Sequence, residues 1–295
     1  MSRLHPVIVF TGSAGAGLTT VRRAFTQLCA RLALTPLLIN GEGFQRYGSA
    51  EMEARIAEAL RKGEHFSHFA LEAYLLEELE ETFRRYGATG RTRYRHYIHS
   101  AAEGEALGGY PAGTFTPWEE SPPGTDLLLY EGLHGAVKTE RVDLPRYADL
   151  LVGVVPIINL EWIQKIHRDT AERGYRPEDV TDTILRRMPD YVNVIAPQFS
   201  RTDINFQRVP LVDTSNPFIA RDIPTADESV VVIRFKDPRK FEVDFRRLLA
   251  RLDGSYMSRY NSIVIPGGQQ ELAMELIFLP ILERLVAGRC TATDR

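Results

Sequence analysis

A glycine-rich segment between a short apolar run and an amphipathic stretch constrains this fold more than any other feature. Residues 7–10 are continuously apolar, as expected of a strand buried on both faces. Residues 20–32 carry apolar side chains at helical spacing, and residues 37–39 form a second short apolar strand. A strand, helix and strand within about 35 residues make a βαβ unit, which predicts a parallel sheet covered by helices.

The loop inside this unit predicts a nucleotide-phosphate site. Main-chain N–H groups at the start of a helix can hold a polyphosphate, and glycines let the chain wrap around it. The alternative is a glycine-rich turn without a ligand, but the flanking strand and helix favour phosphate binding. The candidate ATP-binding residues are Gly12, Ser13, Ala14, Gly15, Ala16, Gly17, Leu18, Thr19 and Thr20.

Two positions at the end of this loop bear on its chemistry. The Thr19 hydroxyl falls where a P-loop uses Ser or Thr to bind Mg²⁺. Leu18 stands where the P-loop motif has the lysine that reaches the β- and γ-phosphates. Either another cation replaces that lysine, or the protein binds nucleotide without turning it over quickly.

The rest of the chain is consistent with one domain over residues 1–295. Helices are expected at 50–62, 70–86, 161–173 and 270–286, and strands at 127–130, 150–158, 192–195 and 230–235. Residues 87–125 are irregular and contain a basic, aromatic run at 91–99. Such a long irregular segment in a compact domain is usually functional, so we predict a mobile lid or substrate loop there.

Charge and composition exclude several classes of protein. The net charge of −3 gives no reason to expect nucleic acid or an anionic membrane as partner. Cys29 and Cys290 are far apart in the sequence, which favours a reducing compartment without disulfides. No apolar stretch approaches the ~20 residues of a membrane span, and the N-terminal apolar run is too short for a signal peptide. We therefore expect a cytoplasmic protein.

Two further segments carry candidate site residues. Glu131 follows an apolar strand, where P-loop enzymes place a carboxylate that serves Mg²⁺, although it can equally cap the next turn. Lys165, Arg168, Asp169 and Arg173 lie on neighbouring turns of one helix. Such a charged run is usually only a solvated face, but it can also supply the cation that Leu18 does not.

These motifs resemble those of the phosphoribulokinases, specifically the bacterial class. The resemblance covers residues 12 to about 285, and its most specific stretches are 129–135, 154–173, 197–198, 202–210, 212–221 and 223–235. It implies a P-loop α/β fold like that of nucleoside-monophosphate kinases, with a mixed, mostly parallel sheet flanked by helices. It also implies ATP and Mg²⁺ as cofactors, and a reaction that converts D-ribulose 5-phosphate into ribulose 1,5-bisphosphate for carbon fixation in the Calvin cycle.

The resemblance also assigns roles to individual residues. Lys165 serves the transferred phosphate, Arg168 and Arg173 hold substrate anions, and Asp169 is an essential carboxylate. Glu131 matches the metal-associated acid of the family. Glu42 stands where the family has an aspartate that acts as base, and His99 matches a contact to the sugar phosphate.

Four departures from the family pattern keep the acceptor open. Glu42 replaces an aspartate, Gln45 a histidine, Ser49 an arginine, and Leu18 a small hydroxyl residue. The leading hypothesis remains a ribulose 5-phosphate kinase, in which Glu42 or Asp169 takes the hydroxyl proton. The alternatives are a kinase for another sugar phosphate or a nucleoside, and a catalytically weak regulatory paralogue that binds nucleotide.

Regulation and assembly are implied by resemblance alone. The bacterial class forms octamers and responds to NADH, an allosteric activator, at a site between subunits. Arg31, Arg234 and Arg259 stand where the arginines of that site are expected. Read without the resemblance, each is more simply a surface arginine.

Overall fold

A single eight-stranded sheet forms the centre of the molecule. The computed structural model describes residues 5–13, 17–155, 157–171, 174–219 and 222–293, without the side chains of 19 and 288–293. The strand order is β2-β5-β1-β6-β7-β8-β10-β9, in which the first five strands run parallel and the last three are antiparallel to their neighbours. The strands are β1 (Val7–Thr11), β2 (Pro36–Asn40), β5 (Leu127–Gly132), β6 (Leu150–Val155), β7 (Ile204–Pro210), β8 (Ser229–Phe235), β9 (Tyr256–Arg259) and β10 (Ser262–Pro266).

Both faces of the parallel part of the sheet are covered. Strand β1 is buried at every position, and its alternate side chains enter different layers. Ile8 and Phe10 belong to one apolar cluster, whereas Val7 and Val9 belong to the other. Because side chains of a strand alternate between faces, a continuously apolar strand requires this double cover.

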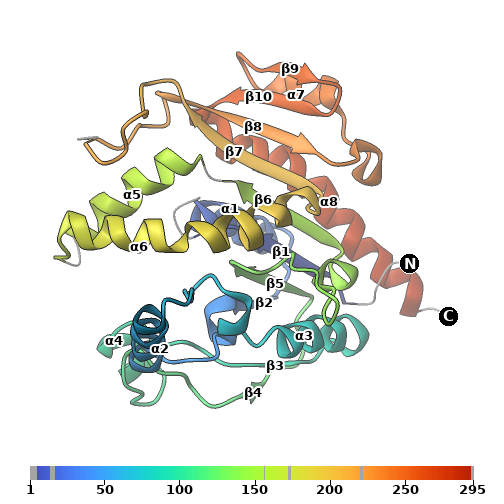
Figure 1. The fold of residues 1–295 in the computed structure, drawn as a ribbon. Helices are drawn as coiled ribbons and strands as arrows, with labels where there is room; N and C mark the ends of the chain where they lie inside the picture. The colour runs from blue at the N-terminus through green and yellow to red at the C-terminus, as the bar shows by residue number, and fades with distance from the viewer. Residues whose placement is uncertain (1–4, 14–16, 156, 172–173, 220–221, 294–295) are drawn as a thin grey trace.

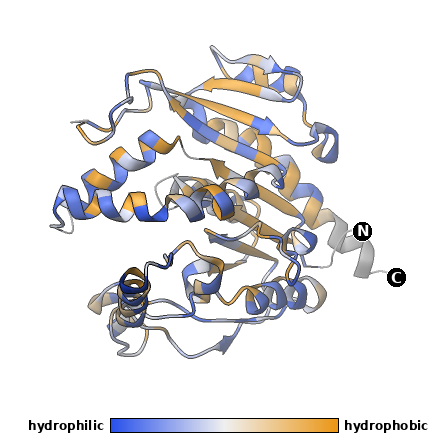
Figure 2. Cartoon of the chain, in the orientation of Figure 1, coloured by the Kyte–Doolittle hydropathy of each residue, from blue (hydrophilic) through white to orange (hydrophobic). Residues whose placement is uncertain are grey.

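Helices from opposite ends of the chain cover the first face. Helix α1 (Leu18–Arg31) packs beside α8 (Gln270–Thr293), as Figure 1 shows. Their contact is aromatic: the rings of Phe10, Phe25 and Phe278 lie 5.2–5.9 Å apart in edge-to-face geometry. Figure 2 shows the apolar strands between helices whose outer surfaces are polar. The C-terminal helix therefore closes the core around the first helix.

The second face is covered by α2 (Ser49–Lys62) and α3 (Leu76–Thr89). Helices α5 (Ile158–Ala171) and α6 (Pro177–Asp190) pack against each other and lie side by side in Figure 1. Since α5 directly follows β6, this pair begins at the carboxyl ends of the parallel strands. Ligands of open α/β sheets bind at that edge.

Most expected elements are confirmed, but the strand expected at 192–195 is wrong, and the strand expected at 150–158 ends at Val155 because α5 begins at Ile158. Residues 191–195 do not form a strand but continue α6 as a π-helical turn, Tyr191–Ile195. Tyr191 and Ile195 are buried while Val192 is exposed, which is helical spacing that a four-residue apolar run does not reveal. The helix expected at 70–86 starts late, because a 3-10 turn, Leu71–Ala73, precedes α3.

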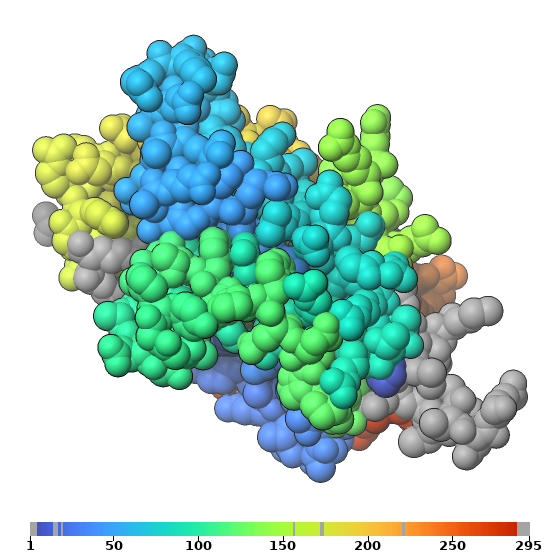
Figure 3. All heavy atoms as spheres, turned by 90° about the horizontal axis from the view of Figure 1, so that it is seen from below, coloured from blue at the N-terminus to red at the C-terminus, as the bar shows by residue number. Residues whose placement is uncertain are grey.

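The segment between residues 87 and 125 is mostly irregular but well anchored. It contains the short strands β3 (Arg93–Tyr94) and β4 (Glu119–Glu120), which pair with each other, and the short helix α4 (Ala101–Ala106). The Ser49 N–H at the start of α2 donates to the Gly113 carbonyl over 2.8 Å. In Figure 3 the green atoms of this segment lie beside the blue atoms of α2.

Cys29 is fully buried, and this burial raises the pKa of its thiol to about 11, so the thiol is inert. Among the described residues, no helix has both the length and the apolar character that crossing a bilayer requires.

Replacing Phe278 with alanine tests the packing of α8 on α1. Phe278 is fully buried in the aromatic cluster, so the truncation leaves a cavity. We expect the free energy of unfolding to fall by about 3–5 kcal/mol, measured by urea denaturation. The matched control is Leu272→Ala on the same helix, because Leu272 is 37% exposed. Equal losses in the two variants would contradict this role of α8.

Candidate active site

Three strand ends place the candidate residues at one edge of the sheet. The parallel register pairs Thr11 of β1 with Gly132 of β5, and Asn40 of β2 with Glu131 of β5. The phosphate loop follows Thr11, and the turn that carries Glu42 follows Asn40. The backbone pairing therefore brings together groups that are far apart in the sequence.

The described part of the phosphate loop is shaped by two glycines. A Cβ atom at Gly12 would lie 2.6 Å from the Val154 carbonyl oxygen, so only glycine lets the loop leave β1 so close to β6. Gly17 begins α1 with a φ of 95°, in the left-handed region that glycine adopts without strain. Ala14, Gly15, Ala16 and the Thr19 side chain lie outside the described residues, so their expected contacts stay predictions.

Leu18 is turned away from any nucleotide. Its side chain is 8% exposed and belongs to the apolar cluster under α1. Only its main chain can therefore face a phosphate group. The first turn of α1 contains no acidic residue, so the positive end of the helix dipole stays available to an anion.

Glu131 is held by an arginine that the sequence reading missed. Arg22, one turn into α1, donates from Nη1 to Glu131 Oε1 over 2.8 Å. The Glu131 side chain is 14% exposed, and burial raises the pKa of its carboxyl, to which nearby Glu42 adds, while Arg22 opposes the rise. An arginine five residues after Gly17 was the available signal, since it lies on the face of α1 next to β5.

The donor set for Mg²⁺ is small. Among the described residues, no three His, Cys, Asp or Glu side chains gather in a metal-binding group. Mg²⁺ bound with a nucleotide needs only one or two protein ligands, because phosphate oxygens and waters complete its shell. The Glu131 carboxylate fits that requirement on its own, and Thr19 stays the second predicted ligand.

Glu42 and His99 meet in one pocket. Glu42 lies in the 3-10 turn Gly41–Phe44, and its own N–H donates to Asn40 Oδ1 over 2.8 Å, which caps the turn. His99 comes from the segment between residues 87 and 125, and its Nε2 lies 2.9 Å from Glu42 Oε2. The pocket measures about 220 Å³ and is also lined by Arg22 and Glu131. Sequence separation hid this pairing, because the two residues are 57 positions apart.

The basic helix is an inward-facing cluster and not a solvated face. Asp169 on α5 is 2% exposed and bonds to Lys165 and, over 3.1 Å, to Arg168. Burial alone would raise the pKa of Asp169, but the hydrogen bonds and charges of Lys165 and Arg168 hold it below its ordinary value. Burial lowers the pKa of Lys165, and Arg187 adds to this effect. Arg173 lies outside the described residues.

Helix α6 adds cationic and polar groups that the sequence reading missed. Arg187 is largely buried, donates from Nη2 to His68 Nδ1 over 3.2 Å and lies 5.1 Å from the centre of the Phe69 ring. Burial lowers the pKa of Arg187, and the charge of Arg186 adds to it, whereas Tyr74, Asp169 and Glu161 oppose it. Arg187 thus adds a positive charge within electrostatic reach of Asp169 and Glu161 on α5 and of Tyr74.

Glu161 of α5 lies within electrostatic reach of Ser13 at the start of the phosphate loop. Burial raises the pKa of Glu161, while Ser13 and the cations Arg187, Lys165 and Arg168 oppose the rise. Ser13 follows Gly12 directly, so the start of the loop and the basic cluster share one environment. The charged helix therefore lies within electrostatic reach of the nucleotide loop.

The substituted residues 45 and 49 have structural partners. Gln45 forms an isolated antiparallel bridge with Tyr74, and its carbonyl accepts a hydrogen bond from Arg95. Ser49 begins α2 against Gly113, as described above. Neither residue brings a positive charge to the pocket of Glu42.

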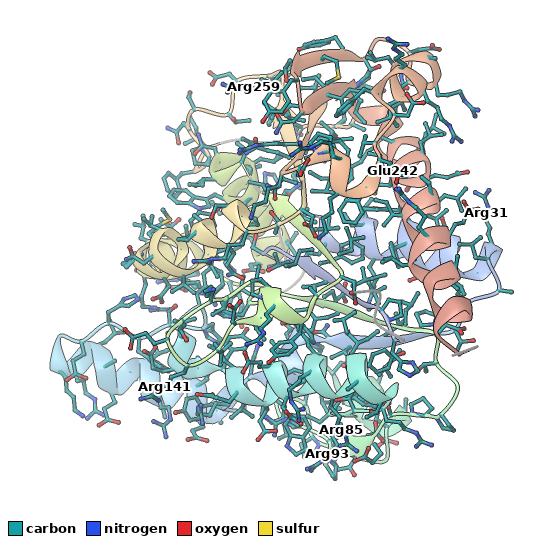
Figure 4. The ribbon with its side chains drawn as sticks, turned by 90° about the vertical axis from the view of Figure 1, so that its right-hand side faces the viewer. Arg31, Arg85, Arg93, Arg141, Glu242 and Arg259 are labelled. Atoms are coloured by element: carbon teal, nitrogen blue, oxygen red, sulfur yellow. The ribbon has the colours of Figure 1, made fainter. Side chains whose placement is uncertain are left out.

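The three arginines expected at a regulatory site separate into two groups. Arg234 and Arg259 line one pocket of about 630 Å³ between β7, β8 and the β9–β10 hairpin. Arg31, at the end of α1, pairs instead with Glu275 of α8 over 2.5 Å. Figure 4 shows Arg31 and Arg259 at different sides of the molecule. A single chain therefore brings two of the three arginines together.

Comparison with known proteins identifies the class to which this fold and site belong. Residues 7–215 match the Phosphoribulokinase / Uridine kinase family. The chain is 58% identical to phosphoribulokinase from Nitrobacter vulgaris over 97% of this chain and 98% of the relative. It is 56% identical to the chromosomal phosphoribulokinase of Cupriavidus necator over the full length of both chains.

A solved structure agrees with the sequence comparison. The phosphoribulokinase from Rhodobacter spheroides superposes with a TM-score of 0.88 at 52% identity, covering 97% of this chain and 98% of that one. The chain belongs to the phosphoribulokinase / uridine kinase family of P-loop kinases. The expected α/β P-loop fold with a mixed, mostly parallel sheet is confirmed.

Buried His134 and half-buried His68, beside the site, make the stability of the fold depend on pH. Burial lowers the pKa of His134 and of His68 from 6.5 to about 4. The unfolded chain takes up these protons near pH 6.5 and the folded chain only near pH 4. The free energy of unfolding therefore falls as the pH is lowered through this window, by up to about 1.4 kcal/mol per pH unit for each histidine.

Replacing His134 with glutamine checks this dependence. The variant loses one of the two titrating groups, so the slope of unfolding free energy against pH between 6.5 and 4 becomes shallower by about one proton. Urea denaturation at several pH values measures the slope, and an unchanged m-value is the control for a comparable unfolding transition. A variant with the wild-type slope would contradict the assignment.

Proposed function

We propose that this chain is an ATP-dependent kinase that phosphorylates D-ribulose 5-phosphate to ribulose 1,5-bisphosphate, the reaction that supplies the acceptor for carbon fixation in the Calvin cycle. The observation that carries the proposal is identity of 56–58% to phosphoribulokinases over essentially the whole chain. The geometry supports it, because an exposed carboxylate, a phosphate loop and a buried cationic cluster follow neighbouring strand ends. The same likeness supports a cytoplasmic enzyme of one domain.

Glu42 is the general base in this proposal. Its side chain is 41% exposed and lines the pocket with His99, so an acceptor hydroxyl can reach it. Asp169 is the less suitable base, because its side chain is 3% exposed and bonds to Lys165 and Arg168. A carboxylate with a lowered pKa that already accepts hydrogen bonds from two cations removes a hydroxyl proton poorly.

Asp169 instead orients the cations that receive the transferred phosphate. Lys165 replaces the lysine that Leu18 does not provide, and Arg168 binds acceptor anions together with Arg173. Mg²⁺, when bound with ATP at Thr19 and Glu131, neutralises charge on the phosphate oxygens. Phosphoryl transfer depends mostly on positioning and on charge stabilisation, which these residues supply.

The segment from 87 to 125 is the lid over the acceptor in this proposal. His99 belongs to it and contacts Glu42, so closing the segment over a sugar phosphate would complete the site. His99 is then a contact for the acceptor as well as a partner of the base. The replacement of the family histidine by Gln45 and arginine by Ser49 leaves these contacts to His99 and to α5.

A Glu42→Gln variant tests the base. Glutamine keeps the size of the side chain but cannot accept the hydroxyl proton, so we expect kcat to fall by about 10²–10⁴-fold with KM for ATP unchanged. A coupled assay of ADP release with ribulose 5-phosphate measures both. The matched control is Glu58→Gln on the exposed surface of α2, where Glu58 pairs only with Lys62 in the described structure. Full activity of Glu42→Gln would remove Glu42 as the base.

The same assay separates the proposal from its two alternatives. Turnover with another pentose phosphate, a hexose phosphate or a nucleoside, but not with ribulose 5-phosphate, would identify a kinase with a changed acceptor. Tight ATP binding without turnover on any acceptor would identify a regulatory paralogue.

We also propose that the bacterial class's regulation and assembly extend to this chain. NADH would activate the enzyme through the pocket of Arg234 and Arg259, whose polar lining also includes Asn205, Gln207 and Tyr260. Arg31 can join this pocket only from a neighbouring copy, because in its own chain it pairs with Glu275. A homo-oligomer, of eight copies by resemblance, meets that need.

An Arg234→Ala variant tests the regulatory pocket. The substitution removes one of its two positive charges, so we expect the ratio of activity with and without NADH to fall towards one. Arg239→Ala is the matched control, because Arg239 is 91% exposed and pairs with Asp237. The native mass of both variants is compared with the wild type by light scattering. An unaffected response to NADH at unchanged native mass would reject this pocket.

A further inference from the structure

Arg95 fixes the turn that carries Glu42. Its Nε donates to the Gly43 carbonyl over 2.7 Å, and its Nη2 donates to the Gln45 carbonyl over 2.6 Å. These two carbonyls flank Phe44 in the main chain that directly follows Glu42. The rigid, planar fork of the guanidinium binds both at once from two nitrogens in a fixed geometry that the single nitrogen of a lysine does not provide.

Arg95 is itself held in place by aromatic rings. The centre of its guanidinium lies 3.8 Å from the centre of the Phe115 ring and 4.8 Å from that of Trp118. Burial lowers the pKa of Arg95, and no carboxylate forms an ion pair with it among the residues described here. A half-buried cation without a carboxylate relies on cation–π contacts and on the two carbonyls.

The main chain of Arg95 also approaches the turn closely. A Cβ atom at Gly43 would lie 2.2 Å from the Arg95 carbonyl oxygen, so only glycine allows this approach. Phe44 adds an edge-to-face contact with Trp118 at 5.5 Å. The turn is thus bound by hydrogen bonds, by ring packing and by close main-chain contact to the same segment.

That segment reaches the carboxylate as well. Four residues after Arg95, His99 places Nε2 2.9 Å from Glu42 Oε2. The His99 N–H donates to Glu103 over 2.8 Å, which ties this end of the segment to α4. One continuous stretch therefore holds the main chain beside Glu42 and contacts its carboxylate.

We propose that Arg95 is a positioning residue for Glu42, which couples the placement of the lid segment to the alignment of the base. The inference rests on the proposed role of Glu42 as general base. Glutamate carries one methylene more than the aspartate of the family pattern, which gives its carboxylate more freedom to move. Its alignment therefore depends more strongly on a fixed main chain. A displacement of ~1 Å in the reacting geometry can cost about 10²-fold in rate.

The test combines substitutions at Arg95 and Glu42. We expect Arg95→Met to lower kcat by about 10–10²-fold, with KM for ATP within about twofold of wild type. Arg95→Lys keeps the charge but loses the fork, so most of the loss is expected to remain. If Arg95 acts through Glu42, the double variant Arg95→Met/Glu42→Gln has about the kcat of Glu42→Gln alone.

The control is Arg85→Met. Arg85 on α3 binds Glu120 of β4 at 3.0 Å and does not contact the turn of Glu42, and Figure 4 shows it near Arg93 at the base of the molecule. Its kcat should equal the wild-type value. Thermal unfolding and ATP binding establish that each variant is folded. If Arg95→Met does not fold, Arg95→Lys replaces it in the test.

Each outcome separates this inference from the proposed function. Wild-type kcat in a folded Arg95→Met or Arg95→Lys variant overturns the positioning role. Losses that multiply in the double variant also overturn it, because Arg95 would then act independently of Glu42. Full activity in Glu42→Gln instead overturns Glu42 as base, whatever the Arg95 variants do.

Discussion

The parallel pairing of β1, β2 and β5 is the constraint on which the site depends. Backbone hydrogen bonds fix Thr11 beside Gly132 and Asn40 beside Glu131, so the phosphate loop, the Glu42 turn and Glu131 must lie at one edge. The pairing tolerates no slip, since a shift by one residue would turn the buried side chains of each strand to the opposite face of the sheet. The burial of apolar strands therefore fixes the geometry of the site, because its summed free energy exceeds that of any single polar contact there.

Carboxylates at this edge are paired with basic side chains; the Lys165–Asp169 pair is largely buried, whereas the His99–Glu42 pair is about half exposed. Asp169 binds Lys165 and Arg168, Glu131 binds Arg22, and Glu42 binds His99. A charge that is already desolvated and oriented needs little reorganisation when phosphate charge develops, which is how electrostatic preorganisation accelerates transfer. In the proposed mechanism, cations of α5 and α6 supply the positive charge that the absent P-loop lysine does not.

The sequence predicted the fold well where local patterns were strong. Continuously apolar strands and the glycine-rich loop indicated a parallel α/β fold, and the resemblance of long stretches identified the family. The strand expected at 192–195 was wrong, because an apolar run of four residues is too short for its periodicity to distinguish a strand from a helix. Helix α6 and strands β7 and β10 were not expected, although Ile263–Ile265 in β10 is an apolar, β-branched run typical of a strand.

What the sequence alone determined is the chemistry available: a phosphate loop without its lysine, a charged helix and a carboxylate after each of two strands. Tertiary structure decided which groups meet. It paired Glu42 with His99, gave Glu131 to Arg22, turned Leu18 into the core and separated Arg31 from Arg234. The physical reason is that side-chain pairing across tens of residues depends on sheet register and helix packing, which local sequence patterns do not encode.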